Sequence, residues 1–211
     1  PLPEVDNVVG VDLGLSHFAI LSDGEKVENP RYLQCDLDKL AKAQRALARK
    51  QKGSKNRAKA RLRVAKLHAR IADKRRDFQH KLSTRLIREN QAIAVETLAV
   101  KNMVRNKRLA RSISDAGWSG FVAMLRYKAE WYGRTLHEID RWTPTSKTCS
   151  GCGHVVDELP LSVRRWECPC CGADHDRDVN AAMNVARAAG LAVSVCRGET
   201  PAPEQLGLFG L

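Results

Sequence analysis

The sequence has no uninterrupted apolar stretch that approaches the roughly 20 residues needed for a membrane-spanning helix. Its first residues, Pro1-Leu-Pro-Glu-Val5, lack the features of a secretory signal peptide. No internal repeat is visible. These absences argue against a membrane protein and against an exported one. Because Pro1–Val5 lead almost at once into a predicted strand, we expect the chain to begin partway through a longer protein.

Acidic residues are scarce relative to basic ones. The 211 residues include 24 Asp and Glu against 36 Lys and Arg, a net charge of +12, while a hydrophobic content of 43% is typical of a globular chain. Between residues 39 and 89 the imbalance is largest, with 3 acids against 19 Lys and Arg. A solvated helix surface is the ordinary explanation, but such surfaces usually mix both signs. The charge therefore favours a polyanionic partner, most plausibly nucleic acid.

The cysteines do not have the distribution expected of a disulfide-bonded exported protein. Most lie in close pairs, and a CxxC…CxxC arrangement provides the four thiolates that tetrahedral Zn²⁺ binds in structural sites. We assign the ligands to Cys149, Cys152, Cys168 and Cys171, and expect one structural Zn²⁺. Cys170 is an extra thiol that could substitute as a ligand, although Cys171 has the matching spacing. We expect Cys35, Cys196, His154 and His175 to take no part.

Apolar patterning predicts the elements. Strands are expected at 8–14, 19–22, 25–29, 92–97 and 135–142, and helices at 119–133 and 179–189, with a loop or broken helix at 101–117. Between about 36 and 90, apolar residues recur near helical spacing and are interrupted at Gly53-Ser54, which predicts two long helices in a hairpin. The order of these elements predicts an α/β fold of ribonuclease-H-like architecture, with a mixed sheet flanked by helices.

Three acids are distinguished by where they lie: Asp12, Glu96 and Asp178. The first two lie in or at the end of apolar strands, where an unpaired carboxylate is costly to bury, and the third begins a helix. Carboxylates that converge at one sheet edge repel one another unless cations neutralise them, and Mg²⁺ prefers such oxygen ligands. Two such ions about 4 Å apart can activate water and stabilise the leaving oxygen in phosphodiester hydrolysis.

Each acid also has an ordinary structural interpretation. Asp12 could be a strand-end or turn acid, and Glu96 could pair with a cation of the basic hairpin. Asp178 could cap the last helix through a backbone N–H group. Asp176 competes with Asp178 for the functional role; Asn180 and the small residues that follow favour Asp178.

Several segments together resemble the TnpB (OrfB) proteins of bacterial insertion sequences, which are compact relatives of the type V CRISPR effectors. The main ones are Val9-Gly-Val-Asp-Leu-Gly-Leu15, Val95-Glu-Thr-Leu98, Ser146-Lys-Thr-Cys-Ser-Gly-Cys-Gly153, Trp166-Glu-Cys-Pro-Cys-Cys-Gly172 and His175-Asp-Arg-Asp-Val-Asn-Ala-Ala-Met-Asn184. The segments Gly53–Arg57 and Leu125–Gly133 resemble the same family. The similarity extends from residue 8 to about residue 190.

The resemblance implies an RNA-guided DNA endonuclease with a RuvC-like nuclease domain, in which Asp12, Glu96 and Asp178 bind two Mg²⁺ ions. It implies a domain plan of nuclease residues 1–148, a zinc ribbon at 149–174, the last nuclease helix at 175–191 and a disordered tail at 192–211. The expected partners are a guide RNA from the transposon end and a target DNA, in the bacterial cytoplasm at the nucleoid.

The basic hairpin is expected to contact the guide–target duplex through its phosphates. The candidate contact residues lie around the hairpin turn: Lys50, Lys52, Lys55, Asn56, Arg57, Lys59, Arg61 and Arg63. Family members usually carry an N-terminal half ahead of the first catalytic aspartate, and this sequence does not contain one. The alternative function is therefore a catalytically silent nucleic-acid-binding or regulatory derivative of the transposon protein. A zinc-ribbon transcription factor leaves the three acids unexplained.

Overall fold

The computed structural model describes residues 1–192. Within this part of the chain, no helix is both long and apolar enough to cross a membrane. The expected disordered tail lies outside the described residues from position 193 onward, as does Cys196.

Five strands form a mixed sheet with the order β3-β2-β1-β4-β5. The strands are β1 Val8–Asp12, β2 His17–Leu21, β3 Lys26–Glu28, β4 Ala92–Glu96 and β5 Thr135–Ile139. The first three strands pair antiparallel, as expected for a meander, whereas β4 runs parallel to both β1 and β5. The predicted α/β class with a mixed sheet is confirmed.

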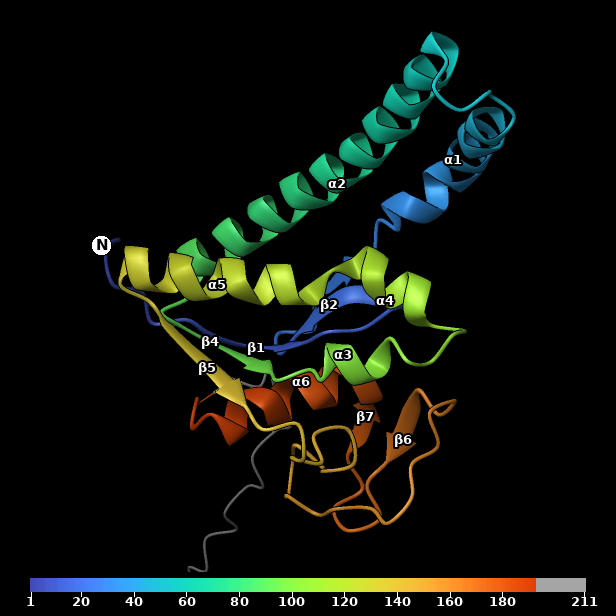
Figure 1. Ribbon diagram of the computed structural model, residues 1–211. Coiled ribbons are helices and arrows are strands. Elements are labelled where there is room, and N and C mark those ends of the chain that lie inside the picture. The colour runs from blue at the N-terminus through green and yellow to red at the C-terminus, as the bar shows by residue number, and fades with distance from the viewer. Residues whose placement is uncertain (193–211) are drawn as a thin grey trace, which may run out of the picture.

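Helices cover both faces of this sheet (Figure 1). They are α1 Tyr32–Ala48, α2 Lys55–Glu89, α3 Val100–Met103, α4 Ala110–Ala116, α5 Trp118–Tyr132 and α6 Arg177–Ala188. On one face, α2 and α5 bury the main core, in which Val11, Leu86 and Phe121 are fully enclosed. On the other face α6 packs across β1, β2 and β4. The central strands are therefore apolar on both sides, which explains their near-continuous Val, Ile and Ala content.

The approach of α6 to β1 depends on Gly10. A Cβ atom at this position would lie 2.0 Å from the carbonyl oxygen of Ala182 and 2.8 Å from the amide nitrogen of Ala186. Only a residue without a side chain lets the helix backbone come so close to the strand. The facing residues of α6, Ala182 and Ala186, are also small, so the close approach depends on small residues on both elements. From the sequence, these residues were predicted only to be part of a helix.

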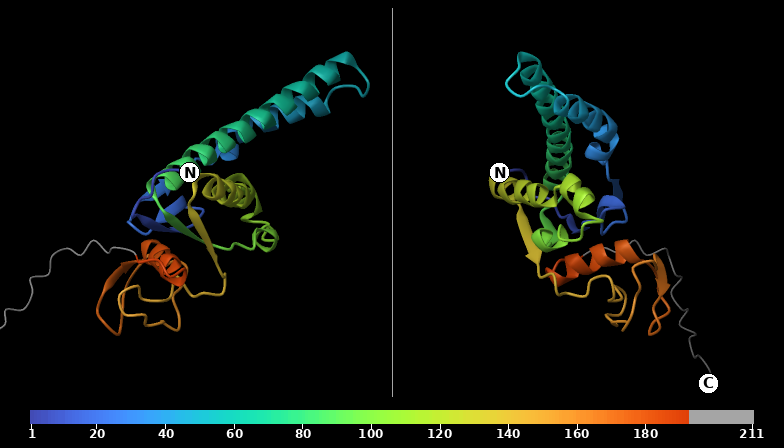
Figure 2. Two further views of the ribbon diagram at one scale, coloured as in Figure 1. Left: turned by 90° about the vertical axis from the view of Figure 1, so that its left-hand side faces the viewer. Right: turned by 45° about the vertical axis from the view of Figure 1, so that its right-hand side comes forward.

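The predicted basic hairpin is confirmed as α1 and α2, which extend away from the sheet as a long arm (Figures 1 and 2). Ser54 caps α2 by accepting a hydrogen bond from the amide of Arg57 at 3.1 Å. Near the base of the arm, buried Asp36 on α1 accepts hydrogen bonds from Lys39 at 2.8 Å and from Lys74 on α2 at 3.3 Å. A carboxylate held by two ammonium groups fastens one helix to the other.

Two elements differ from the sequence-based expectation. The strand expected at 135–142 ends at Ile139, because its partner β4 ends at Glu96 and the last ladder bond runs from the Thr97 amide to the Ile139 carbonyl at 3.0 Å. The cysteine segment carries a further two-stranded sheet, β6 Arg165–Glu167 and β7 Asp174–Asp176, that the patterning did not predict. Strands of three residues are too short to show an alternating pattern. The broken helix expected at 101–117 corresponds to α3 and α4.

Candidate active site and metal centre

Asp12 and Glu96 are the last residues of two neighbouring parallel strands. The register pairs Val11 with Val95, so the next residue along each strand is one of the two acids. Since parallel strands end at the same edge of a sheet, both carboxylates lie at the carboxyl edge of β1 and β4. Burial raises the pKa of Glu96 above its usual range. The predicted juxtaposition of these two acids follows directly from the parallel pairing.

Asp178 reaches this edge from the first turn of α6, the helix that crosses β1. Asp12 is affected by both of the other acids: its pKa is raised to about 7, first by burial and then by the negative charges of Glu96 and Asp178. The positive charge of Arg177 opposes this rise only in part. A site that penalises its own negative charge in this way is one that a cation would stabilise.

Asp176, not Asp178, caps α6. Its carboxylate accepts hydrogen bonds from the amides of Asp178 at 3.1 Å and Val179 at 3.2 Å, and it also accepts one from Lys26 on β3 at 2.5 Å. Burial opposes ionisation of Asp176, but the Lys26 ammonium and the two amides outweigh it and lower the pKa of this carboxyl. The structure thus gives the capping role to Asp176 and leaves the Asp178 side chain for other contacts, and the functional role of Asp178 stays a prediction.

One contact of Asp178 was not foreseen from the sequence. Arg164, just before β6, places Nη1 at 3.3 Å and 3.4 Å from the two carboxylate oxygens of Asp178. The adjacent backbone is tied to α6, because the Arg177 amide donates to the Arg164 carbonyl at 2.9 Å. The Arg177 side chain also donates to the Pro160 carbonyl at 2.8 Å. A basic pair at 164–165 was visible in the sequence, but nothing there indicated that it faces an acid.

The three acids do not form a tight ligand group. Among the described residues, the four predicted cysteines are the one set of His, Cys, Asp or Glu side chains whose ligand atoms all lie within 4.8 Å of one another. Mg²⁺ usually retains several waters and takes only one or two carboxylates directly, so it does not require a ligand group as close as that of the cysteines.

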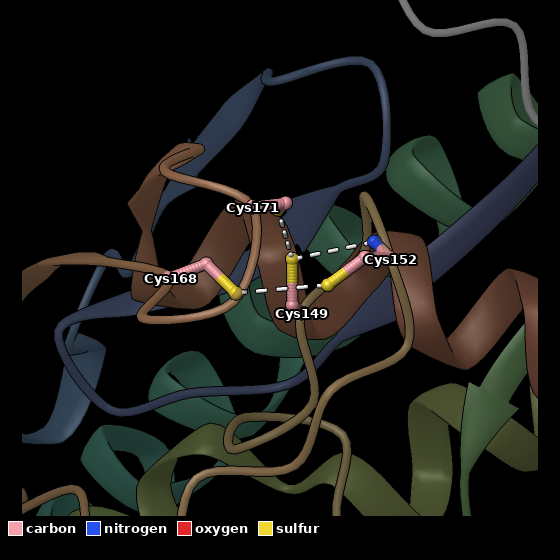
Figure 3. A group of neighbouring side chains, drawn as sticks. All are labelled: Cys149, Cys152, Cys168 and Cys171. Atoms are coloured by element: carbon pink, nitrogen blue, oxygen red, sulfur yellow. Dashed lines mark hydrogen bonds between the residues drawn. The ribbon is translucent and has the colours of Figure 1, made fainter.

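The cysteine cluster has the dimensions of a tetrahedral metal site (Figure 3). Sγ of Cys149 lies 3.7 Å from Sγ of Cys171, and Sγ of Cys152 lies 3.7 Å from Sγ of Cys168. Zinc–sulfur bonds of about 2.3 Å place tetrahedral sulfurs about 3.8 Å apart. Cys149, Cys152, Cys168 and Cys171 therefore fit a structural metal ion, and Cys170 is exposed and outside the group.

His175, which we expected to take no part, lies beside this cluster. Its Nε2 atom lies 3.0 Å from Sγ of Cys149, and its ring stands 4.8 Å from the ring of Trp166. A ring nitrogen at this distance can donate a hydrogen bond to a thiolate, which reduces the negative charge that four sulfurs bring together. His175 is thus a supporting contact of the metal centre.

Two asparagines of α6 hold the first cysteine knuckle against the helix. The Asn180 side chain accepts from the Ser150 amide and donates to the Thr148 carbonyl, both at 2.8 Å. Asn184 donates to the carbonyls of Thr145 at 2.8 Å and Thr148 at 2.5 Å. Both side chains are buried. The helix that carries Asp178 is consequently also the support of the cysteine segment.

The predicted contact residues of the hairpin surround its turn. Of the eight, all but Arg57 are exposed. The Arg57 guanidinium donates to the carbonyls of Leu47 at 3.2 Å and Lys50 at 3.0 Å, so it closes the end of α1. The exposed members present amines, guanidinium groups and an amide around the tip of the arm, at its end away from the sheet (Figure 2).

Two family models match the chain. The one described as "Probable transposase" (OrfB_IS605) matches residues 1–107, and the one described as "Cas12f1-like, TNB domain" matches residues 118–185. The second match spans both the cysteine cluster and Asp178.

Curated relatives are similar over most of this chain. A Streptomyces pristinaespiralis protein named "Putative RNA-guided DNA endonuclease" is 56% identical over 196 residues, covering 93% of this chain and 48% of that protein. A Mycobacterium tuberculosis protein (strain H37Rv) of the same printed description is 39% identical over 193 residues, covering 86% of this chain and 42% of that protein. The chain spans about half the length of the curated relatives it matches.

A solved structure shares the fold. The chain is similar to Cas12f1 in a complex described as containing sgRNA and target DNA, with a TM-score of 0.59 and 17% sequence identity. The similarity covers 88% of this chain and 50% of that one.

Proposed function

Because the chain belongs to the TnpB (OrfB_IS605) family, we propose that it forms the nuclease part of an RNA-guided DNA endonuclease, with a ribonuclease-H-like (RuvC-like) fold. The observation that carries this proposal is the convergence of Asp12, Glu96 and Asp178 from β1, β4 and α6, where the pKa of Asp12 is raised to about 7. A buried acid whose pKa is raised by burial and by two neighbouring acids has no evident structural purpose. The printed names of the curated relatives support the same function.

The acids are the proposed ligands of two Mg²⁺ ions. When bound, these ions would activate a water molecule and stabilise the leaving oxygen of a DNA phosphodiester. Asp12 and Glu96 are held rigidly by the sheet, so their oxygens keep fixed positions. Asp178 is oriented by the helix start that Asp176 caps. The sheet and the capped helix together preorganise the oxygen ligands.

Arg164 is proposed to exchange partners when a nucleic-acid strand enters. Its guanidinium now contacts Asp178, and its side chain is 61% exposed. A guanidinium matches phosphate geometry as well as carboxylate geometry. A phosphate next to Asp178 therefore competes for Arg164, and the arginine then helps to hold the scissile strand.

The cysteine cluster is proposed to bind one structural Zn²⁺. Its four thiols fill a tetrahedral shell, which leaves no open position for substrate. The ribbon that it closes carries Arg164 and contacts α6 through Asn180 and Asn184. The metal thus takes no part in the chemical step and supports catalysis indirectly, because it keeps the ribbon folded beside the acids.

The arm formed by α1 and α2 is proposed to follow a guide RNA–target DNA duplex. Exposed Lys50, Lys52, Lys55, Asn56, Lys59, Arg61 and Arg63 can contact phosphates without reading sequence. The guide and target are inferred as partners from the complex in which the structural neighbour was solved. The arm is long and projects from the sheet (Figure 2), and its surface is basic, so it suits contact with a nucleic-acid backbone.

A catalytically silent nucleic-acid binder is the second candidate. The observation that favours it is the basic arm, whose exposed cations would bind phosphates whether or not the acids cut.

Cleavage of labelled single-stranded DNA by the purified chain tests the proposal. We expect cutting with Mg²⁺, no cutting without it, and loss of cutting in Asp12→Ala and Asp178→Ala. Asp38→Ala, on the exposed side of α1, is the matched control and should cut normally. Unchanged cutting by Asp12→Ala would overturn the assignment of the acids. If the purified chain, the two variants and the control all bind the DNA and none of them cuts it, the result would favour the silent binder.

A further inference from the structure

A groove of about 500 Å³ lies where three segments meet: the turn after β1, the start of α1 and the helix α4. Its lining includes Ser16 from the turn, Arg31 from the start of α1, and Arg111 and Ser112 from α4. None of these residues belongs to the predicted contact set at the hairpin tip. The groove is therefore a separate surface feature of the protein.

The groove carries uncompensated positive charge. Neither Arg31 nor Arg111 forms an ion pair among the described residues. The carboxylate that lines the groove belongs to Asp115, which is buried and accepts from the Leu33 amide at 3.0 Å with each oxygen. Asp115 therefore caps α1 from the neighbouring helix. The Arg31 guanidinium also donates to the Leu15 carbonyl at 3.5 Å, which uses one of its five N–H groups and leaves the others, with those of exposed Arg111, available to an anion.

Arg31 is held in an unusual backbone conformation. With φ 46° and ψ 48°, it is the one described residue other than glycine with positive φ. Asn29 supports this conformation, because its amide group donates to the Leu15 carbonyl at 3.0 Å and accepts from the Arg31 amide at 3.3 Å. Glycine or asparagine would adopt these angles at lower cost. An arginine at this position is a candidate for function, since strained residues concentrate at binding sites.

The groove opens at the same edge of the sheet as the acids. Ser16 lies four residues after Asp12, in the turn that follows β1, and α4 lies in the segment that follows Glu96 and β4. A nucleic-acid strand in contact with the acids can therefore extend along the same edge toward this groove.

We propose that this groove binds the phosphodiester backbone of the strand that enters the acid site, and this inference rests on the proposed function. Arg31 and Arg111 supply planar guanidinium groups suited to phosphate, and Ser16 and Ser112 supply hydroxyl donors. The groove positions the strand a short distance away from the phosphate that is cut. It contributes affinity and register and takes no part in the chemistry.

The salt dependence of single-stranded DNA binding tests the groove. A fluorescent oligonucleotide of twenty deoxythymidines is titrated with the full chain at several salt concentrations, without added divalent cation so that no strand is cut. Each phosphate contact with a single strand contributes about 0.7 to the slope of log affinity against log salt. For Arg31→Asn/Arg111→Gln we expect roughly tenfold weaker binding at about 0.1 M salt and a slope smaller by about 1.4. An RNA oligonucleotide should respond alike, because phosphate is the recognised group.

The matched control removes the same charge elsewhere. Arg88→Gln/Arg187→Gln takes two exposed arginines from the ends of α2 and α6 and should weaken binding less than about twofold, with nearly the same slope. Equal effects of the two double variants would overturn the proposal, because net charge alone would then explain them. If the Arg31 change prevents folding, Arg111→Gln alone, on an exposed helix position, should still lower the slope by about 0.7. An unchanged slope in that variant would also overturn it.

The outcome is independent of whether the chain cuts DNA. A smaller slope in a chain that shows no nuclease activity supports the groove and contradicts the proposed function. An unchanged slope in a chain whose cutting needs Asp12 and Asp178 supports the function and contradicts the groove.

Discussion

At the scale of single residues, Asp12 shows the cost of building an acidic site. Its folded-state pKa of about 7 lies above the ordinary value of 3.8, so the folded protein favours the protonated form. The contribution of Asp12 to stability is therefore greatest below about pH 4 and declines as the pH rises toward 7, because ionisation of this group is harder in the folded state than in the unfolded one. A bound cation removes this penalty.

Replacing Asp12 should therefore stabilise the protein while abolishing cutting. Without divalent cations, we expect Asp12→Asn to raise the melting temperature at pH 8 by several degrees, equivalent to about 1–3 kcal/mol, and to change it little at pH 4. Added Mg²⁺ should narrow the difference in melting temperature between the two proteins, because it binds and stabilises the unmodified protein and not the variant. Melting curves at both pH values check this. Asp38→Asn is the control, and an equal gain for both variants, or a gain at pH 4, would contradict the explanation.

The role of Asp176 is separable from that of Asp178. We expect Asp176→Ala to destabilise the protein by about 1–2 kcal/mol, because two amides at the start of α6 lose their acceptor. Asp176→Asn retains an acceptor and should recover most of the stability. Thermal denaturation with a parallel nuclease assay measures both effects. If Asp176→Ala melts like the unmodified chain, the cap does not stabilise the helix.

Single residues could be assigned from the sequence where their partners lie close by in the sequence. The four cysteine ligands follow from their spacing, and the cluster confirms them as one group. Arg164 and His175 were missed because their partners, Asp178 and Cys149, are brought to them by tertiary folding. The acidic triad stays a prediction about metal binding, although Glu96 and Asp178 both raise the pKa of Asp12.

At the scale of elements, the contact between β1 and α6 determines the geometry of the site. The carbonyl oxygen of Ala182 occupies the space that a side chain at residue 10 would need. Backbone atoms cannot move aside as a flexible side chain can. The orientation of Asp178 relative to Asp12 thus depends on Gly10, two residues before β1 ends.

Gly10→Ala should be strongly destabilising. We expect a loss of about 3 kcal/mol or more, or a displaced α6, because the new methyl group overlaps helix backbone. Gly120→Ala on α5 is the matched control: its Cβ would meet only the Gln79 side chain at 3.6 Å, and alanine favours the helix. Denaturant unfolding of both variants decides the matter. A Gly10→Ala protein as stable as Gly120→Ala would mean that α6 is free to shift.

Long helices and central strands were predictable because their patterns repeat over several turns or residues. The end of β5 was not, because a strand ends where its partner ends, and that partner lies elsewhere in the sequence. The small residues of α6 predicted a helix but gave no sign that they let it contact β1.

At the scale of the whole molecule, the cysteine ribbon is attached to the sheet mainly through α6. The main core contains no ribbon residue, and the ribbon has a small core of its own around Trp166. Loss of the metal should therefore disorganise the ribbon without unfolding the sheet.

Cys152→Ser tests this separation. We expect loss of the bound zinc, measured by elemental analysis as a fall from one ion per chain, together with loss of nuclease activity. The main thermal transition should persist with a modest decrease in temperature. Cys170→Ser, next to the cluster but outside it, is the control and should retain zinc and activity. Full activity in a zinc-free Cys152→Ser protein would show that the ribbon does not position Arg164 or Asp178.

The three acids come from the beginning, the middle and the end of the described chain, and this spacing has a consequence during protein synthesis. A nascent chain can complete β1 and β4 while still attached to the ribosome, but it then holds two acids that repel each other and no third. The site is completed only when α6 has emerged and settled over Gly10. A partly translated chain therefore lacks one of the three proposed ligands, and the proposed site is complete only after α6 has been synthesised.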